Sequence, residues 1–265
     1  GGILMNNLHK TQDSNNPIPN TNTNNTKSKK SYFFVILSVF IIFCILSFVG
    51  YEFIKYKQQN ELYNTALSLK NEKQFGSAED LFLSLGDFKD SQEQIDLIKE
   101  DYITDFAKTA GSIYGTGISS WVLGSPYGKI FIQCDYTTSI LAVSRMKNED
   151  MIKNEMARIE NLISDNEKAL SALKNPPSAY KGCYDLLLNI LDNDKNIYEL
   201  AKNPISYYDT YTSEYFTRYD KLDESFNSLT EHMKNCDNSS IFNKLSRSYC
   251  ADIIAQSDIK DTEIN

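Results

Sequence analysis

The sequence predicts an all-α protein made of a single transmembrane helix, a helical hairpin and an antiparallel bundle of four to five helices. Three observations lead to this fold class. Residues 31–51 carry no charged side chain and form an almost purely aliphatic and aromatic run. The rest of the chain repeats apolar residues at intervals of three and four, which is the spacing of one helix face, without sustained alternation. Prolines and polar stretches fall between these stripes, at positions where helices end.

We expect the two ends of the chain, residues 1–30 and 258–265, to be disordered. Eight of the twenty residues 6–25 are Asn, interleaved with Thr, Ser and two Pro. Such a tract has too little apolar surface to offset the entropy lost on ordering. The two glycine codons at the start can spell a ribosome-binding sequence ahead of Met5, which suggests a bacterial gene whose translation begins at Met5.

Residues 31–53 are predicted to cross a lipid bilayer as an uncleaved signal anchor. A helix of ~20 apolar residues is long enough to span the hydrocarbon core. A cleavable signal peptide would need small residues at its cleavage site, but bulky Phe48 and Val49 stand near the end of the run. A lipoprotein would need a small residue before Cys44, where Phe43 stands.

Lysines flank the predicted span on both sides, with three in residues 27–30 and two in residues 55–57. The basic cluster in front of the span, together with the short tail, favours a cytoplasmic N-terminus and an extracytoplasmic body. The sequence thus predicts a single-pass protein of the cell membrane, whose first partner is the lipid bilayer.

Residues 57–106 are predicted to form a helical hairpin followed by a capping helix. Apolar residues at helical spacing lie on both sides of a turn near residues 71–74: Leu62, Ala66, Leu69, Phe75, Ala78, Phe82 and Leu85. These residues resemble the tetratricopeptide repeat (TPR), in which a small residue such as Ala78 precedes a large aromatic such as Phe82 by one turn. The match covers about 34 residues and lacks the repeat-closing Pro, because Asp90 and Ser91 stand there.

The resemblance implies a TPR-like hairpin that binds a peptide or acts as a spacer or docking element. A lone repeat cannot bury both of its faces, so we expect it to lean on the following helix. Residues 86–91 also resemble the turn that follows such hairpins in membrane-anchored proteins of low-G+C bacteria.

Residues 107–257 are predicted to form the helical bundle. Apolar stripes with steps of three and four run through residues 152–173, 183–201, 208–233 and 242–253, separated by prolines or by the polar stretch 235–240. Short connections make consecutive helices antiparallel neighbours. Asn166 and Asp194 each stand in an otherwise apolar seam, where a polar group fixes helix register or reaches water at the edge.

One uncharged segment, residues 109–128, holds five of the 11 glycines and the only tryptophan. Its spacings fit neither a phosphate-binding loop nor a nucleophile elbow. Two interpretations remain. The small residues, among them Gly111 and Gly115, allow close helix packing, or the segment is an apolar surface that meets a protein partner, with Trp121 and Tyr127 at the interface.

Four cysteines lie in the predicted body: Cys134, Cys183, Cys236 and Cys250. An even count outside the cytoplasm permits disulfides, of which Cys236 with Cys250 is the simplest; four buried reduced thiols are the alternative. His232 and Cys236 are one helical turn apart, as two metal ligands are, but no second ligand pair has metal-site spacing, so no metal is predicted.

Charge and composition narrow the function. The chain has a net charge of −8, and 33 of its 35 acidic residues follow residue 53, so nucleic acid is not an expected partner. We find no catalytic residues with recognisable spacing and no cofactor motif. We therefore expect a non-enzymatic interaction or scaffold module with a protein partner. The alternatives are a ligand- or glycan-binding protein, with a tyrosine-lined groove among residues 180–219, and a cell-envelope enzyme.

Overall fold

The computed structural model describes residues 27–124, 149–203, 208–236 and 238–257, and every regular element in these ranges is helical. The predicted all-α class is therefore confirmed. In chain order the elements are α1 (Lys27–Asn71), α2 (Phe75–Leu85), α3 (Ser91–Gly124), α5 (Glu149–Ala172), the short 3-10 helix η2 (Ser178–Tyr180), α6 (Cys183–Lys202), α7 (Tyr208–Met233) and α8 (Ser239–Ala255). The chain divides into two compact units, Gly1–Tyr56 and Lys57–Asn265.

In the first unit, α1 contains a segment that is long and apolar enough to cross a membrane. The span begins at Tyr32, and its most apolar 18-residue window has a mean hydropathy of 2.9 with none of its residues buried. Its large apolar side chains from Tyr32 to Tyr56 are between 41% and 70% exposed. The part of α1 between Tyr32 and Tyr56 therefore has none of the buried face that a core helix of a soluble protein would have.

The second unit begins with the last turns of α1, followed by α2. Ala66, Ala78 and Phe82 are fully buried, and the ring of Tyr63 meets that of Phe82 edge to face at 5.6 Å. The Tyr63 hydroxyl also donates a hydrogen bond to Asp90, in the turn that leads into α3. Small residues at the contact thus bring the helices close together, while aromatic rings fill the space beside them.

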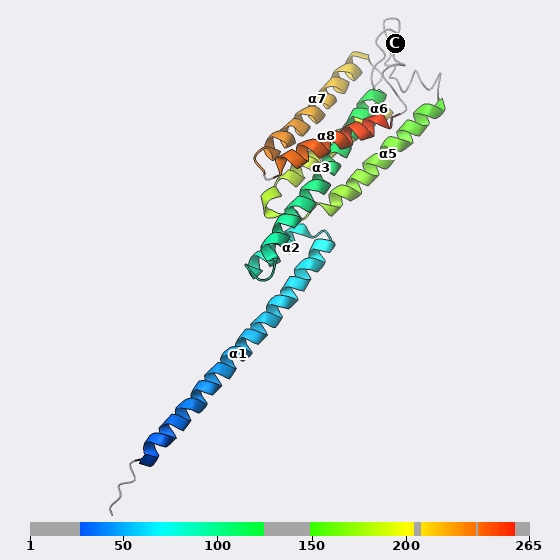
Figure 1. Ribbon diagram of the computed structural model, residues 1–265. Coiled ribbons are helices and arrows are strands. Elements are labelled where there is room, and N and C mark those ends of the chain that lie inside the picture. The colour runs from blue at the N-terminus through cyan, green and yellow to red at the C-terminus, as the bar shows by residue number, and fades with distance from the viewer. Residues whose placement is uncertain (1–26, 125–148, 204–207, 237, 258–265) are drawn as a thin grey trace, which may run out of the picture. The chain divides into compact units, whose positions relative to one another are not determined.

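Helix α3 runs without a break from Ser91 to Gly124 and contacts α2, α5, α6, α7 and α8 (Figure 1). It therefore belongs to both segments that the sequence divides at residue 106. One cluster of buried side chains includes residues from Tyr63 to Phe242. Residues 57–106 and 107–257 therefore share a core, through which α3 runs.

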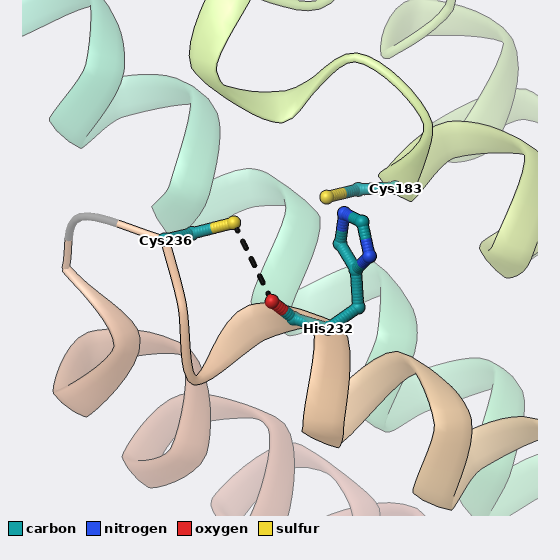
Figure 2. Close-up of side chains that lie close together, drawn as sticks. All are labelled: Cys183, His232 and Cys236. Carbon is teal, nitrogen blue, oxygen red and sulfur yellow. Dashed lines mark hydrogen bonds between the residues drawn. The ribbon is translucent and has the colours of Figure 1, made fainter.

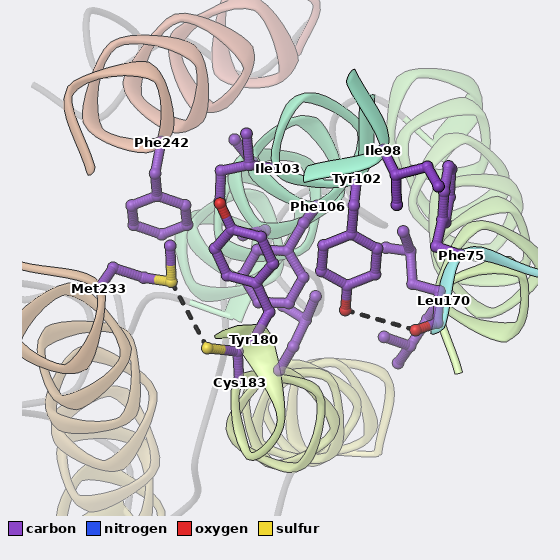
Figure 3. Close-up of a cluster of buried hydrophobic side chains, with 14 of the residues drawn as sticks. Phe75, Ile98, Tyr102, Ile103, Phe106, Leu170, Tyr180, Cys183, Met233 and Phe242 are labelled. Carbon is purple, nitrogen blue, oxygen red and sulfur yellow. Dashed lines mark hydrogen bonds between the residues drawn. The ribbon is translucent and has the colours of Figure 1, made fainter. Parts of the chain in front are cut away.

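Aromatic side chains form the centre of this core, as Figure 3 shows. The ring of Tyr102 stacks on Phe106 at 5.8 Å and on Tyr180 at 5.4 Å, and Phe106 meets Phe242 of α8 at 6.0 Å. The Tyr102 hydroxyl donates to the backbone oxygen of Leu173 at 3.4 Å, so its polar end is satisfied within the core.

A buried carboxylate on α5, that of Glu155, helps to link this helix to the end of α8. Glu155 is only 1% exposed, and it accepts hydrogen bonds from the guanidinium of Arg158 at 2.7 and 2.9 Å and from the Ser257 hydroxyl at 2.7 Å. Arg158 in turn donates to the backbone oxygen of Ile253 at 3.3 Å. These bonds join α5 to the end of α8.

Tyr114 of α3 joins α7 through a hydrogen bond and a stacked ring. Its hydroxyl donates to Asp223 at 2.7 Å, and its ring stacks on Phe226 at 4.1 Å. Burial and then the Asp223 carboxylate raise the pKa of Tyr114, so the hydroxyl remains a donor at any physiological pH.

We expect Tyr114→Phe to lower the free energy of unfolding by about 1–2 kcal/mol, since a hydrogen bond to a carboxylate is lost at a half-buried site. Urea unfolding followed by circular dichroism measures this loss. A double-mutant cycle with Asp223→Ala isolates the bond itself. A coupling free energy indistinguishable from zero would contradict the expectation.

Candidate functional site

The structure places Gly111 and Gly115 inside the contact between α3 and α8. A β-carbon added at Gly111 would lie 2.2 Å from the backbone oxygen of Ser246, and one at Gly115 would lie 2.9 Å from that of Cys250. Both glycines are buried. Of the two interpretations of this segment, the structure therefore has close helix packing at these two positions, and neither glycine is available to a partner.

Trp121 stacks on α7, with its ring 5.4 Å from that of Tyr215 and 4.7 Å from that of Tyr219. It is half-buried, and its indole nitrogen is buried without a hydrogen-bond partner among the described residues. Tyr127 lies outside the described residues. Trp121 is therefore largely used in packing within the bundle, although part of its ring remains exposed.

Four of the eight tyrosines between residues 180 and 219 belong to the core. Tyr180, Tyr198, Tyr211 and Tyr215 are all buried. A surface groove of about 410 Å³ between α5 and α6 is lined by one of them, Tyr198, and by charged side chains that pair with each other. Lys202 lies 2.8 Å from Glu160 in this groove, and Lys195 pairs with Glu167. Four of the five charged residues that line the groove are thus engaged in ion pairs.

Cys236 and Cys250, the predicted disulfide pair, are both free thiols in the structure. Cys236 instead lies beside Cys183 and His232 (Figure 2). The two sulfur atoms and one imidazole nitrogen all lie within 4.8 Å of one another. We refer to Cys183, His232 and Cys236 as the thiol–imidazole cluster. Cys134, the remaining body cysteine, lies outside the described residues.

Local structure explains how the cluster forms. Cys183 is the first residue of α6, and Gly182 before it adopts a left-handed conformation with φ of 95°, which turns the chain from η2 into the helix. His232 lies in the last turn of α7. The chain then folds back in a turn in which the backbone N–H of Cys236 donates to Met233 at 3.1 Å. The start of α6 and the end of α7 thereby bring three donors to one place.

The cluster extends from the core to the surface. Cys183 is fully buried, Cys236 is half-buried and His232 is exposed. The Cys183 thiol donates to the Met233 sulfur at 3.6 Å, visible in Figure 3, and the Cys236 thiol donates to the backbone oxygen of His232 at 3.7 Å. Burial and then the neighbouring Cys236 raise the pKa of the Cys183 thiol to about 12, so the hydrogen bond from Cys183 to Met233 is that of a neutral thiol.

The sequence contained part of this signal. It places His232 and Cys236 one turn apart, but the third donor, Cys183, is distant in the chain and only the packing of α6 against α7 brings it near. The spacing of ligands along the chain does not reveal Cys183, because the cluster combines the start of α6 with the end of α7 and the turn after it.

Asn166 and Asp194 are both buried in the seams where the sequence places them. Asn166 donates to the Thr116 hydroxyl at 3.2 Å, and the Ser120 hydroxyl lies 3.4 Å from one oxygen of Asp194. The other oxygen of Asp194 has no partner among the described residues. Burial raises the pKa of Asp194 well above its usual range, because the apolar surroundings disfavour the charged form. Both polar residues point to α3, which fits a role in helix register.

Comparison of the chain with models of known protein families, with curated proteins and with solved structures finds no match.

Proposed function

We propose that the protein is anchored in the cell membrane by a single helix and acts as an extracytoplasmic interaction or scaffold module. The observation that carries this proposal is the uniform exposure of the apolar side chains of α1 between Tyr32 and Tyr56. Water penalises such a surface strongly, whereas a bilayer covers it. The basic residues 27–30 support a cytoplasmic N-terminus and an extracytoplasmic body.

The hairpin supports the interaction role. Leu62 of α1 is 43% exposed and Leu83 of α2 is 53% exposed, so each helix of the hairpin keeps a leucine in contact with solvent. A protein partner that docked on this part of the chain would cover these two side chains. A TPR-like hairpin used for docking would account for them. A ligand- or glycan-binding role or a cell-envelope enzyme is the alternative class.

Membrane anchoring is tested by placing charges in the span. We expect the double change Ile41→Lys and Ile42→Lys to shift the protein from the membrane to the soluble fraction, because each charge costs about 2.5–3.5 kcal/mol at the centre of a membrane helix. Fractionation after alkaline extraction measures the shift, and Ile41→Leu with Ile42→Leu is the matched control. A wild-type chain released by alkali, or shortened by cleavage after the span, would contradict the anchor.

Orientation and docking have separate tests. A C-terminal alkaline phosphatase fusion is expected to be active, and a cytoplasmic reporter at the same site is expected to be inactive.

A photocrosslinker at position 83 is expected to give one discrete adduct in intact membranes, whereas one at exposed Asp192 gives none. Equal labelling at both positions would argue against a docking hairpin.

A further inference from the structure

The thiol–imidazole cluster brings together three of the side-chain atoms that bind transition metals best. Its sulfur atoms and its imidazole nitrogen lie within 4.8 Å of one another (Figure 2). Around a tetrahedral zinc ion, with bonds of about 2.3 Å to sulfur and about 2.0 Å to nitrogen, ligand atoms stand roughly 3.5–3.8 Å apart. The cluster therefore needs a contraction of at most about 1.3 Å, within the reach of side-chain rotation at exposed His232 and half-buried Cys236.

The charges also suit a divalent cation. Two thiolates balance the charge of Zn²⁺, so the bound site would be neutral where it meets the core at Cys183. No carboxylate belongs to the cluster, and soft sulfur with imidazole selects zinc over magnesium or calcium.

We propose that Cys183, His232 and Cys236 bind one Zn²⁺ ion, with the fourth position open to solvent on the side of His232. Binding forms two Zn–S bonds and one Zn–N bond, and the two thiol protons leave to solvent. The S–H donations to the Met233 sulfur and the His232 backbone oxygen are lost in exchange. The ion joins the start of α6 to the turn after α7.

A disulfide between Cys183 and Cys236 is the competing use of the same two sulfurs. It would leave the imidazole of His232 without a role, although Figure 2 shows this ring pointing at the Cys183 sulfur. The three-atom convergence favours the metal, and the experiment makes the disulfide an explicit outcome.

The test uses the full-length protein in detergent micelles, divided into two portions. In the first portion, free thiols are alkylated rapidly during purification. The second portion is gently reduced and its metal is removed. We expect the second portion to bind one equivalent of Zn²⁺ in competition with a chromogenic chelator. Co²⁺ in place of zinc is expected to give a sulfur-to-cobalt charge-transfer band in the near ultraviolet.

Variants assign the ligands. Cys183→Ser, His232→Gln and Cys236→Ser should each weaken Zn²⁺ binding by at least ~100-fold, since even groups behind the ligands contribute about 10–100-fold. Cys250→Ser, which changes a thiol outside the cluster, should bind as the wild type does. His232 is exposed, so His232→Gln keeps the fold even if Cys183→Ser does not, and circular dichroism verifies this.

Three results would overturn the proposal. The first is a Cys183–Cys236 disulfide in the alkylated portion, detected as a mass two hydrogens lighter with both cysteines protected. The second is a fully reduced chain that does not retain zinc against the chelator. The third is wild-type affinity in His232→Gln, which would remove the imidazole from the site.

Discussion

Replacing Gly111 by alanine is expected to destabilise the body by about 3 kcal/mol, at the upper end of the usual cost of overpacking. The added methyl group would lie 2.2 Å from the backbone oxygen and 2.9 Å from the carbonyl carbon of Ser246. These are main-chain atoms of α8, so no side-chain rotation can relieve the overlap and α8 itself must move. Alanine favours a helix over glycine by about 1 kcal/mol, which offsets only part of this cost.

Urea unfolding monitored by circular dichroism measures the change. Gly50→Ala is the matched control, because Gly50 is also helical but has nothing within 4 Å of the added carbon. We expect this control to unfold as the wild type does. Equal stability of Gly111→Ala and the wild type would mean that α3 and α8 are not in the close contact described.

Replacing Asp194 by asparagine is expected to stabilise the protein by about 1–3 kcal/mol at neutral to alkaline pH. The wild-type carboxyl group is fully buried, with one oxygen unpartnered among the described residues and a raised pKa. An amide of the same shape removes the titration from this site and can donate to the Ser120 hydroxyl.

The pH dependence follows from the direction of the shift. Below the unfolded-state pKa of about 3.9, Asp194 is protonated in both states and its contribution is fully retained. As the pH rises, the unfolded state loses the proton first, so the wild type loses stability until the raised folded-state pKa is passed. The advantage of Asp194→Asn should therefore be small near pH 4 and grow as the pH rises above the unfolded-state pKa.

Asp192→Asn is the control for this series, because Asp192 lies on the same helix but is exposed. Thermal unfolding across the pH range compares the three proteins. A constant difference between Asp194→Asn and the wild type at every pH would contradict a raised folded-state pKa at position 194.

The helices themselves were accessible from the sequence because helix-forming stripes are a local property. The apolar run of α1, the stripes of α5 to α8 and the Pro176–Pro177 break all reappear as elements or as element boundaries. The length of α3 was not predicted. The segment around residue 106 changes from a mixed to an uncharged composition, but it contains neither proline nor a helix-stopping sequence, so one helix passes through.

Contacts between distant helices could not be predicted in the same way. The spacing of Gly111 and Gly115 shows that a close approach is feasible, but not which helix approaches; the structure shows that it is α8. Cys183 joins His232 and Cys236 for the same reason, since α6 and α7 lie side by side. The sequence identified Asn166 and Asp194 as polar residues in apolar helix faces. It could not show that one oxygen of Asp194 lacks a hydrogen-bond partner among the described residues, because that depends on which helices pack around it.

The glycine-lined contact between α3 and α8 also constrains the order in which the chain can fold during synthesis. The hairpin of α1 and α2 and the first turns of α3 can pack soon after they emerge, because their partners are near in sequence. The contact at Gly111 and Gly115 can form only after α8, the last helix described, has been synthesised. Until then a narrow apolar face of α3 stays open to water. A nascent chain of this protein therefore carries an unfinished core through most of its synthesis.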